Sequence, residues 1–491
     1  MLKSGDIKLS KEIFLTSYFS DEGTNEPFRM DVTQLVQEIQ LYESINRSTL
    51  TGVLVLVDAA GLLDRLPLTG NELLEFTAHS PGFTPEDKST HGYDFTMKSG
   101  FPMFVYSIKS ISEPSPGVKT YALRFCSKEL IKDRQRKLCK AFEGPIHDTV
   151  FKVLRGHLKS KKNWFFEQTT PIVKYVIPKK SPLDTIKFLC KESVSKKFKS
   201  AGFFFWETSD GFHFKSLENM ITNPSGVAKR AIAQYTNSPK LMAGARYKTK
   251  KGNTIIKGNN ERVFEFKILN RYDTLSNINK GVYASKLVTY DAFSKEFDEQ
   301  DFSYPHEFVN TTHMGQISKD TTSETNGLMP IYNYEDNKLL SDFSEGRYMF
   351  LSATQGMHHE TTDKEPFDTA DIKNTIQRSI SQQGAFNSFS IELLVPGNTA
   401  VTAGSVIEFS TLTSSGVDNP TIDPYMSGTY LVVEVRHIMQ SITNNTIHNM
   451  TLICAKDSIS RPYMKNDKEV LHTEKDQYAD FDQYEIDGIL S

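Results

Sequence analysis

Residues 428–457 constrain the fold more than any other part of the chain, because they have the pattern of one long β-hairpin. The first arm, 428–437, reads Gly-Thr-Tyr-Leu-Val-Val-Glu-Val-Arg-His, with the alternation of a strand rich in β-branched residues. The second arm follows Asn444 and Asn445, which suit a turn because asparagine tolerates positive φ. Two upstream strands, 389–397 and 404–410, complete most of a small closed antiparallel barrel. Such a barrel has no catalytic centre of its own and suggests a building block of a larger ring.

Length and composition extend this expectation to the whole chain. A chain of 491 residues predicts several domains, and 33 Phe and 20 Tyr against 2 Trp favour β structure. Four widely spaced cysteines without a CxxC pair argue against a zinc site or a disulfide framework and fit a reducing cytoplasm. No apolar run approaches the roughly 20 residues that cross a bilayer, and the N-terminus has no signal-peptide core, so we expect no membrane anchor.

Residues 1–128 predict a first β domain. A continuous apolar run at 50–58 has the pattern of a buried strand. Asp58 is placed to cap a short helix, and Pro67 stops that helix. The segment 31–44 fits a helix and a strand equally well.

Residues 129–261 predict a mixed α/β peripheral domain. Apolar residues at helical spacing mark 144–158, and a second helix begins at Ser181, a plausible N-cap. An aromatic hairpin, 202–214, follows with its turn at Asp210-Gly211. The hairpin has the composition of a domain core or an inter-subunit contact more than that of a ligand platform.

A second barrel is predicted in two pieces. Residues 262–304 open it and residues 371–457 complete it, entering through an amphipathic helix. Between them lies a polar insertion, 305–370, and after them an acidic tail, 458–491. The expected fold class is therefore mainly β with α+β modules: two antiparallel β-barrels plus a mixed middle domain. The two barrels resemble each other in their pattern of predicted elements and not in residue identity.

Taken in order, several segments resemble the baseplate hub proteins of contractile-tailed phages, of the T-even-like and marine myovirus type. The matching segments are 50–58 with 66–70, 280–290, 377–382, 395–397, 403–409, and 427–437 through 456–457. Neither the insertion nor the acidic tail matches this pattern. The motif residues in these segments are Gly52, Asp58, Pro67, Gly70, Pro396, Gly397, Gly404, Gly428, Tyr430 and His437.

The resemblance implies a homotrimer whose subunits each contribute two tail-tube-like barrels, so that three chains form a ring of six units. Such a ring adapts a three-fold spike to a six-fold tail tube, nucleates the tube and leaves an axial channel for DNA. The implied partners are a central spike protein, a tail tube or tube-initiator protein and neighbouring baseplate proteins, with DNA only in transit. The implied location is the virion baseplate, after synthesis in the host cytoplasm. The spike would be a separate chain, because no glycine-rich β-helical repeat is present.

Two other functions remain open beside this one. The hub of a phage-derived contractile injection particle would share the same architecture. A tail-associated peptidoglycan hydrolase would need a catalytic pair, and the sequence contains no GxSxG, Walker-type GxxxxGK[ST] or GxGxxG motif. We therefore expect no enzyme activity, no catalytic residue and no cofactor.

Metal binding has one weak candidate. Residues 357–360 read Met-His-His-Glu, which lacks the HExxH spacing that places two imidazoles on one helical face. His306 and His313 lie nearby in sequence, but nothing fixes their distance. A loop segment is the favoured interpretation, and no metal site is predicted. A structural hydrogen bond is likewise favoured over catalysis for His437.

The charge is unevenly distributed. Residues 127–199 contain 19 Lys or Arg against 7 Asp or Glu, whereas 465–491 contain 3 against 8. The basic block next to Trp164 suggests either phosphate contacts with nucleic acid or contact with an acidic neighbouring protein, and we favour the protein. The tail segment 477–490 fits either an arm that orders on a partner or plain disorder. The candidate partner-facing residues are Lys132, Arg134, Arg136, Lys137, Lys159, Lys161 and Lys162.

Overall fold

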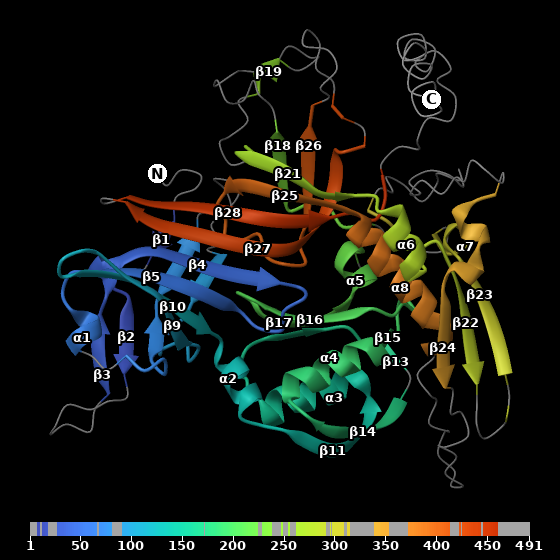
Figure 1. The fold of residues 1–491 in the computed structure, drawn as a ribbon, viewed down its shortest axis with the longest axis horizontal. Helices are drawn as coiled ribbons and strands as arrows, with labels where there is room; N and C mark the ends of the chain where they lie inside the picture. Colours follow the sequence, from blue (N-terminus) through green and yellow to red (C-terminus); the bar gives the residue numbers. More distant parts are fainter. Residues whose placement is uncertain are drawn as a thin grey trace, which may run out of the picture.

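Strands dominate the structure, and 13 of them join in one sheet that runs through both halves of the chain (Figure 1). This confirms the mainly β fold class. No helix in the described ranges is long and apolar enough to cross a membrane. The computed structural model describes residues 7–9, 12–17, 27–65, 68–80, 91–170, 172–223, 228–237, 247–248, 254–255, 262–290, 295, 297–308, 312–314, 338–352, 372–412, 422–423, 425–442 and 445–459.

The first β unit is built around one core between a large and a small sheet. The ambiguous segment 31–44 is mostly strand, because its alternate side chains Ile39 and Leu41 are fully buried. A short turn of helix, α1 (Leu62–Arg65), follows. The large sheet has the order β3 (Phe28–Asp31), β2 (Phe14–Ser17), β6 (Leu73–Glu75), β9 (Met103–Ser115), β10 (Val118–Cys126), β5 (Thr51–Asp58), β4 (Val36–Ser44); the small one contains β1 (Lys8–Leu9), β7 (Thr77–Ser80) and β8 (His91–Asp94).

The second β unit closes into a barrel. Its hairpin strands pair antiparallel from Leu431↔Ala455 to Ile442↔Asn445, which confirms the predicted hairpin. A parallel bridge from Thr236 to Arg262, three residues before the first strand of the row, brings the two ends of the row together, and fully buried side chains such as Phe409 and Tyr430 fill the interior. The strand row is β21 (Glu265–Arg271), β25 (Phe389–Pro396), β28 (Asn445–Ala455), β27 (Gly428–Ile442), β26 (Val406–Thr411), β18 (Ala233–Asn237).

The two units share a strand order. The first unit runs β4-β5-β10-β9-β6-β2, and the second runs β21-β25-β28-β27-β26-β18. The last pair differs, since β2 is antiparallel to β6 whereas β18 is parallel to β26. The repeat that the sequence carries only in pattern is therefore present in the topology.

The middle module, residues 128–223, packs two helices between a two-stranded ribbon and a three-stranded sheet (Figure 1). The predicted hairpin pairs from Phe203↔Ser216 to Thr208↔Gly211, and Ser181 caps the second helix by accepting from the Asp184 N–H at 3.3 Å. The ribbon is β11 (Leu138–Pro145) and β14 (Ile172–Lys180); the sheet is β12 (Trp164–Phe166), β17 (Gly211–Ser216) and β16 (Phe203–Thr208). The other elements are α2 (Lys128–Arg134), α3 (Ile146–Lys152) with a π turn η2 (Val153–His157), α4 (Pro182–Glu192), α5 (Leu217–Ile221), β13 (Thr169–Thr170) and β15 (Val194–Ser195).

Two strands lie outside the domains predicted for them. Part of the range 262–304, which is predicted to open the second barrel, does not join it, because Gly281 at φ 76° ends α6 (Thr274–Lys280) and turns the chain away. It becomes β22 (Ala284–Tyr290) in a separate sheet with β23 (Phe297–Ser303) and β24 (Tyr348–Ser352), the last from the predicted insertion. Conversely, β18 of the predicted middle domain belongs to the second unit. Strand periodicity identifies a strand but not its neighbours.

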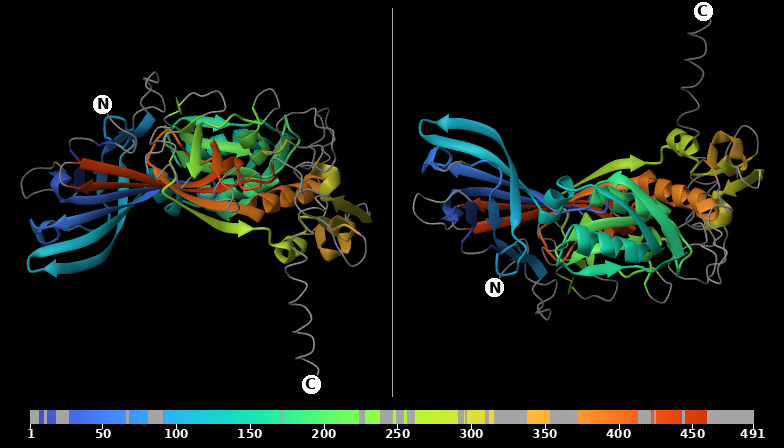
Figure 2. Two further views of the ribbon diagram at one scale, coloured as in Figure 1. Left: turned by 90° about the horizontal axis from the view of Figure 1, so that it is seen from above. Right: turned by 90° about the horizontal axis from the view of Figure 1, so that it is seen from below.

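The remaining elements connect these parts. Helix α8 (Ile372–Ser388), the amphipathic helix predicted at the start of 371–457, leads into β25. The first unit and the separate sheet lie at opposite ends of the long axis in both views of Figure 2, with the second unit between them. The other short elements are α7 (Tyr304–Phe308), η1 (Thr33–Leu35), η5 (Leu340–Asp342), η6 (Ser344–Gly346), and the pair β19 (Tyr247–Lys248) and β20 (Thr254–Ile255).

Candidate functional site

The candidate functional site is the seam where the two β units pair through β27 and β4. Strand β27 is paired with β28 along one edge. Its other edge pairs first with β26, from Gly428 to Leu431, and then with β4 of the first unit, from Glu434↔Ser44 to Gln440↔Glu38. One 15-residue strand thus completes its own barrel and joins it to the neighbouring unit.

The two faces of the seam differ. On one face, Val435, His437 and Met439 are buried, and Met439 belongs to the core of the first unit. The other face carries a ladder of polar bonds that cross the seam. These bonds run from Gln440 Nε2 to Glu38 Oε2 at 2.7 Å, from Arg436 Nη2 to Gln40 Oε1 at 3.0 Å, and from Ser44 Oγ to Glu434 Oε1 at 2.9 Å.

His437 is bonded to a second buried histidine. Its Nδ1 lies 3.1 Å from Nε2 of His448, so one ring donates and the other accepts. Burial lowers the pKa of His437 to about 3, and burial together with His437 lowers that of His448 well below its usual value, so both rings are neutral. A Cβ at Gly397 would lie 2.1 Å from the His448 ring, so only glycine fits there. The geometry is that of a packed structural pair.

Glu43 joins three parts of the chain at one buried carboxylate. Its Oε1 accepts from the Tyr93 hydroxyl at 2.7 Å in the first unit and from the Ser209 N–H at 3.2 Å in the middle module. Its Oε2 accepts from the Ala403 N–H at 3.0 Å in the second unit. Burial outweighs these bonds and raises the pKa of Glu43 to about 7.

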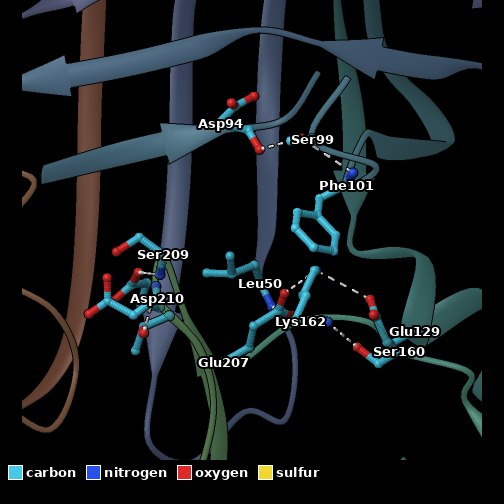
Figure 3. Close-up of polar contacts among 12 residues, drawn as sticks. Leu50, Asp94, Ser99, Phe101, Glu129, Ser160, Lys162, Glu207, Ser209 and Asp210 are labelled. Atoms are coloured by element: carbon cyan, nitrogen blue, oxygen red, sulfur yellow. Dashed lines mark hydrogen bonds and ion pairs between the residues drawn. The ribbon is translucent and has the colours of Figure 1, made fainter. Parts of the chain in front are cut away.

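Lys162 connects the middle module internally and to the first unit. Its ammonium lies 3.3 Å from Glu129 Oε2 and bonds to Glu207, while the other oxygen of Glu207 accepts from the Leu50 N–H at 2.9 Å (Figure 3). Burial lowers the pKa of Lys162, but the two carboxylates outweigh burial and the net shift is upward, so the lysine stays charged. Lys162 is buried, and its charge is matched internally. The prediction that it faces a partner is therefore wrong.

The other predicted basic residues reach the surface. Arg134, Lys137, Lys159 and Lys161 are exposed. The ammonium of Lys132 donates to the Lys159 carbonyl at 3.3 Å, and the guanidinium of Arg136 donates to the His157 carbonyl at 2.6 Å, so both are half-buried at the same edge of the module.

Several of the predicted motif glycines lie at close approaches or at positive φ. Cβ atoms at Gly52 and Gly404 would lie 2.2 Å from Phe125 and 2.7 Å from Trp206, and Gly70, Gly404 and Gly428 have positive φ. Asp58 accepts from the Ala60 and Leu63 N–H groups; burial raises its pKa, but the backbone N–H groups outweigh burial and leave it lowered. The rest are Pro396, which ends β25, Tyr430, whose hydroxyl donates to the Met426 carbonyl at 2.5 Å, and Pro67, which lies outside the described residues.

In the described ranges no group of three His, Cys, Asp or Glu side chains is placed to hold a metal ion. Residues 357–360 lie outside those ranges. His313 Nδ1 is 2.7 Å from Asp457 Oδ2, and its Nε2 is 2.8 Å from the Phe308 carbonyl, whereas His306 is exposed beside Glu307. Sequence reasoning missed Glu43, Glu207 and Asp457. Glu43 and Glu207 could have been found from the sequence, because each carboxylate occupies a strand position at which the alternation predicts a buried side chain.

Comparison with known proteins finds similarity in structure alone. No protein family and no curated protein matches the sequence. The tail protein from Neisseria meningitidis MC58 is similar over 91% of this chain and 96% of its own, with 10% identity and a TM-score of 0.47. The 43 kDa tail protein of prophage MuSo2 from Shewanella oneidensis is similar over 92% and 100%, with 8% identity and a TM-score of 0.47. The E. coli c3393 protein, a component of the type VI secretion system, is similar over 88% and 76%, with 10% identity and a TM-score of 0.38.

Proposed function

We propose that this chain is a structural, non-enzymatic hub subunit of a contractile phage tail, made in the host cytoplasm and built into the virion baseplate. The tail setting comes from the sequence resemblance. The assembly is supported by one observation: a single chain holds two units of one strand order, joined side by side by strand pairing. In this proposal three copies form a ring of six units, which adapts a three-fold spike to a six-fold tube and initiates the tube.

The seam within the chain suggests how copies contact each other. In the shared strand order, β9 stands where β27 stands and β21 stands where β4 stands. One edge of β9 pairs with β6 only through Met103 and Phe104. Beyond Val105 this edge has no strand partner among the described residues. Strand β21 pairs with β25 alone in that part of the chain. Pairing of β9 from one copy with β21 of the next would therefore repeat the seam.

The side chains on these two edges fit such a contact. On β9, Ile111 is 58% exposed and Tyr106 43%; on β21, Leu269 is 48% exposed and Ile268 46%. Unpaired edges with large apolar side chains are an aggregation liability unless another strand covers them. Each copy offers one edge of each kind, so the contact between copies is head-to-tail. Such contacts close into a ring of six units when each unit is rotated by one sixth of a circle relative to its neighbour.

We place the polar face of the seam toward the axial channel. Its ladder of Glu38, Gln40, Arg436 and Gln440 suits a water-filled passage, while the opposite face is committed to the cores. The ladder contains one guanidinium, that of Arg436, and two carboxylates, those of Glu38 and Glu434, so it offers DNA in transit no excess of cations to bind. The two ends of the ring remain for the spike, the tube or tube-initiator protein, and neighbouring baseplate proteins.

The oligomeric state tests the proposal. Mass photometry of the purified chain, alone or with spike protein, is expected to give three times 55.7 kDa, and negative-stain images are expected to show a hollow three-fold ring. Ile111→Lys and Leu269→Lys should each abolish the trimer and leave the far-UV circular dichroism spectrum of the folded chain unchanged, since both side chains are exposed. The matched control is Phe297→Lys on β23, an apolar side chain that is 62% exposed and away from both edges. A chain that stays monomeric with spike present contradicts the proposal.

A further inference from the structure

The ribbon of β11 and β14 presents an uncovered face at the margin of the molecule, beyond α3 and α4 (Figure 1). Val173 and Ile177 point inward and are buried among the helices. The alternate residues point outward: Ile172 is 54% exposed and Val176 is 73% exposed, with exposed Lys174 between them. In the described chain the two strands pair only with each other, so each also has an open backbone edge.

The surface of residues 127–199, the segment that contains this ribbon, is more positive than the sequence suggests. Of the seven carboxylates in 127–199, three are buried, whereas only Lys162 of the 19 cations is. The buried carboxylates are used internally, as Asp133 accepts from the Leu183 N–H at 2.6 Å and Glu167 from the Ser216 N–H at 2.7 Å. The solvent-accessible part of the segment therefore carries 18 cations against four carboxylates. Such an excess attracts an acidic partner.

The chain itself contains a segment of complementary chemistry. Residues 477–490 read Gln-Tyr-Ala-Asp-Phe-Asp-Gln-Tyr-Glu-Ile-Asp-Gly-Ile-Leu, with four carboxylates, no Lys or Arg, and six large apolar side chains. Carboxylates alternate with apolar residues through 484–487. An extended chain of this composition offers apolar side chains to Ile172 and Val176 and carboxylates to the lysines of the surrounding segment.

We propose that residues 477–490 bind the outward face of the β11–β14 ribbon of the same chain. The connecting residues 460–476 span at most about 60 Å when extended, which gives the segment a reach comparable to a protein domain. Tethering keeps its local concentration in the millimolar range, so even a weak contact is occupied. The exposed apolar side chains of Ile172 and Val176 favour a protein segment over nucleic acid, which would use the lysines alone. This proposal is independent of the hub function.

A peptide of residues 477–491 and a chain ending at residue 476 test this. The truncated chain is expected to bind the labelled peptide in fluorescence anisotropy, with affinity falling on the order of tenfold between 50 and 300 mM salt. The full-length chain should bind the peptide at least tenfold more weakly, because its own segment occupies the face. Hydrogen exchange should show slower exchange in 172–180 of the full-length chain than of the truncated chain.

Two variants locate the site. Val176→Glu in the truncated chain should weaken binding of the peptide at least tenfold. Met97→Glu, which changes a matched exposed apolar residue in the first unit, should leave the affinity for the peptide unchanged. Equal binding to the full-length and truncated chains overturns the proposal, as does equal binding to the two variants. A truncated chain that binds a 20-base-pair DNA duplex but not the peptide also overturns it in favour of nucleic acid. Trimer formation should not change in any of these chains.

Discussion

At the scale of single residues, Lys162 provides the sharpest test of the buried charges. Lys162→Met leaves Glu129 and Glu207 buried without their cation, which costs about 3–5 kcal/mol in comparable sites. Urea unfolding at pH 7 should register this loss, and Lys161→Met should stay within about 0.5 kcal/mol of the parent because Lys161 is exposed. Adding Glu207→Gln to Lys162→Met should restore part of the stability. Equal urea midpoints for Lys162→Met and Lys161→Met would contradict the buried interaction of Lys162 with its two carboxylates.

Glu43 makes stability depend on pH. In the unfolded chain this carboxyl loses its proton near pH 4.5, but in the folded chain it keeps the proton until about pH 7. Raising the pH across this window therefore favours unfolding, by about 3 kcal/mol in total. Glu43→Gln cannot ionise, so its Tm should fall less than that of the parent between pH 5 and pH 8. The idea fails if the two Tm curves run parallel through this window.

At the scale of elements, Gly404 controls how the β16–β17 hairpin sits on the second unit. Its φ is +86°, and a Cβ there would lie 2.7 Å from Trp206, whose Nε1 donates to the Ala403 carbonyl at 3.0 Å. Gly404→Ala should destabilise by about 1–3 kcal/mol and shift Trp206 fluorescence, read in a Trp164→Phe background. Gly100→Ala has φ +78° and open space around it, so it carries the backbone strain without the collision. A matching fluorescence shift in Gly100→Ala would refute the collision.

The elements also separate what the sequence predicts from what it does not. The arms of the 428–457 hairpin are predictable because alternation and β-branching are local properties. The partner of β22 is not, since the same alternation fits any sheet, and the turn at Gly281 decides which one it joins. Asp58 as a cap depends on neighbours within five residues. Glu43 and Glu207 depend on partners up to 360 residues away, which no local pattern contains.

At the scale of the whole molecule, the proposed contact between copies is head-to-tail, and this has a consequence that a symmetric contact lacks. A chain with Ile111→Lys has a damaged β9 edge but an intact β21 edge, and a chain with Leu269→Lys has the reverse. Each variant alone should stay near 55.7 kDa, because every contact that it can form with itself includes one damaged edge.

Mixing the two variants should restore one contact and no more. The intact β9 of the Leu269→Lys chain pairs with the intact β21 of the Ile111→Lys chain, and the two edges left over are both damaged, so growth stops at two chains. Mass photometry of an equimolar mixture should show a species of twice 55.7 kDa with one copy of each variant. Dimers in either variant alone would instead require a symmetric contact, and a mixture without dimers would mean that β9 and β21 do not meet.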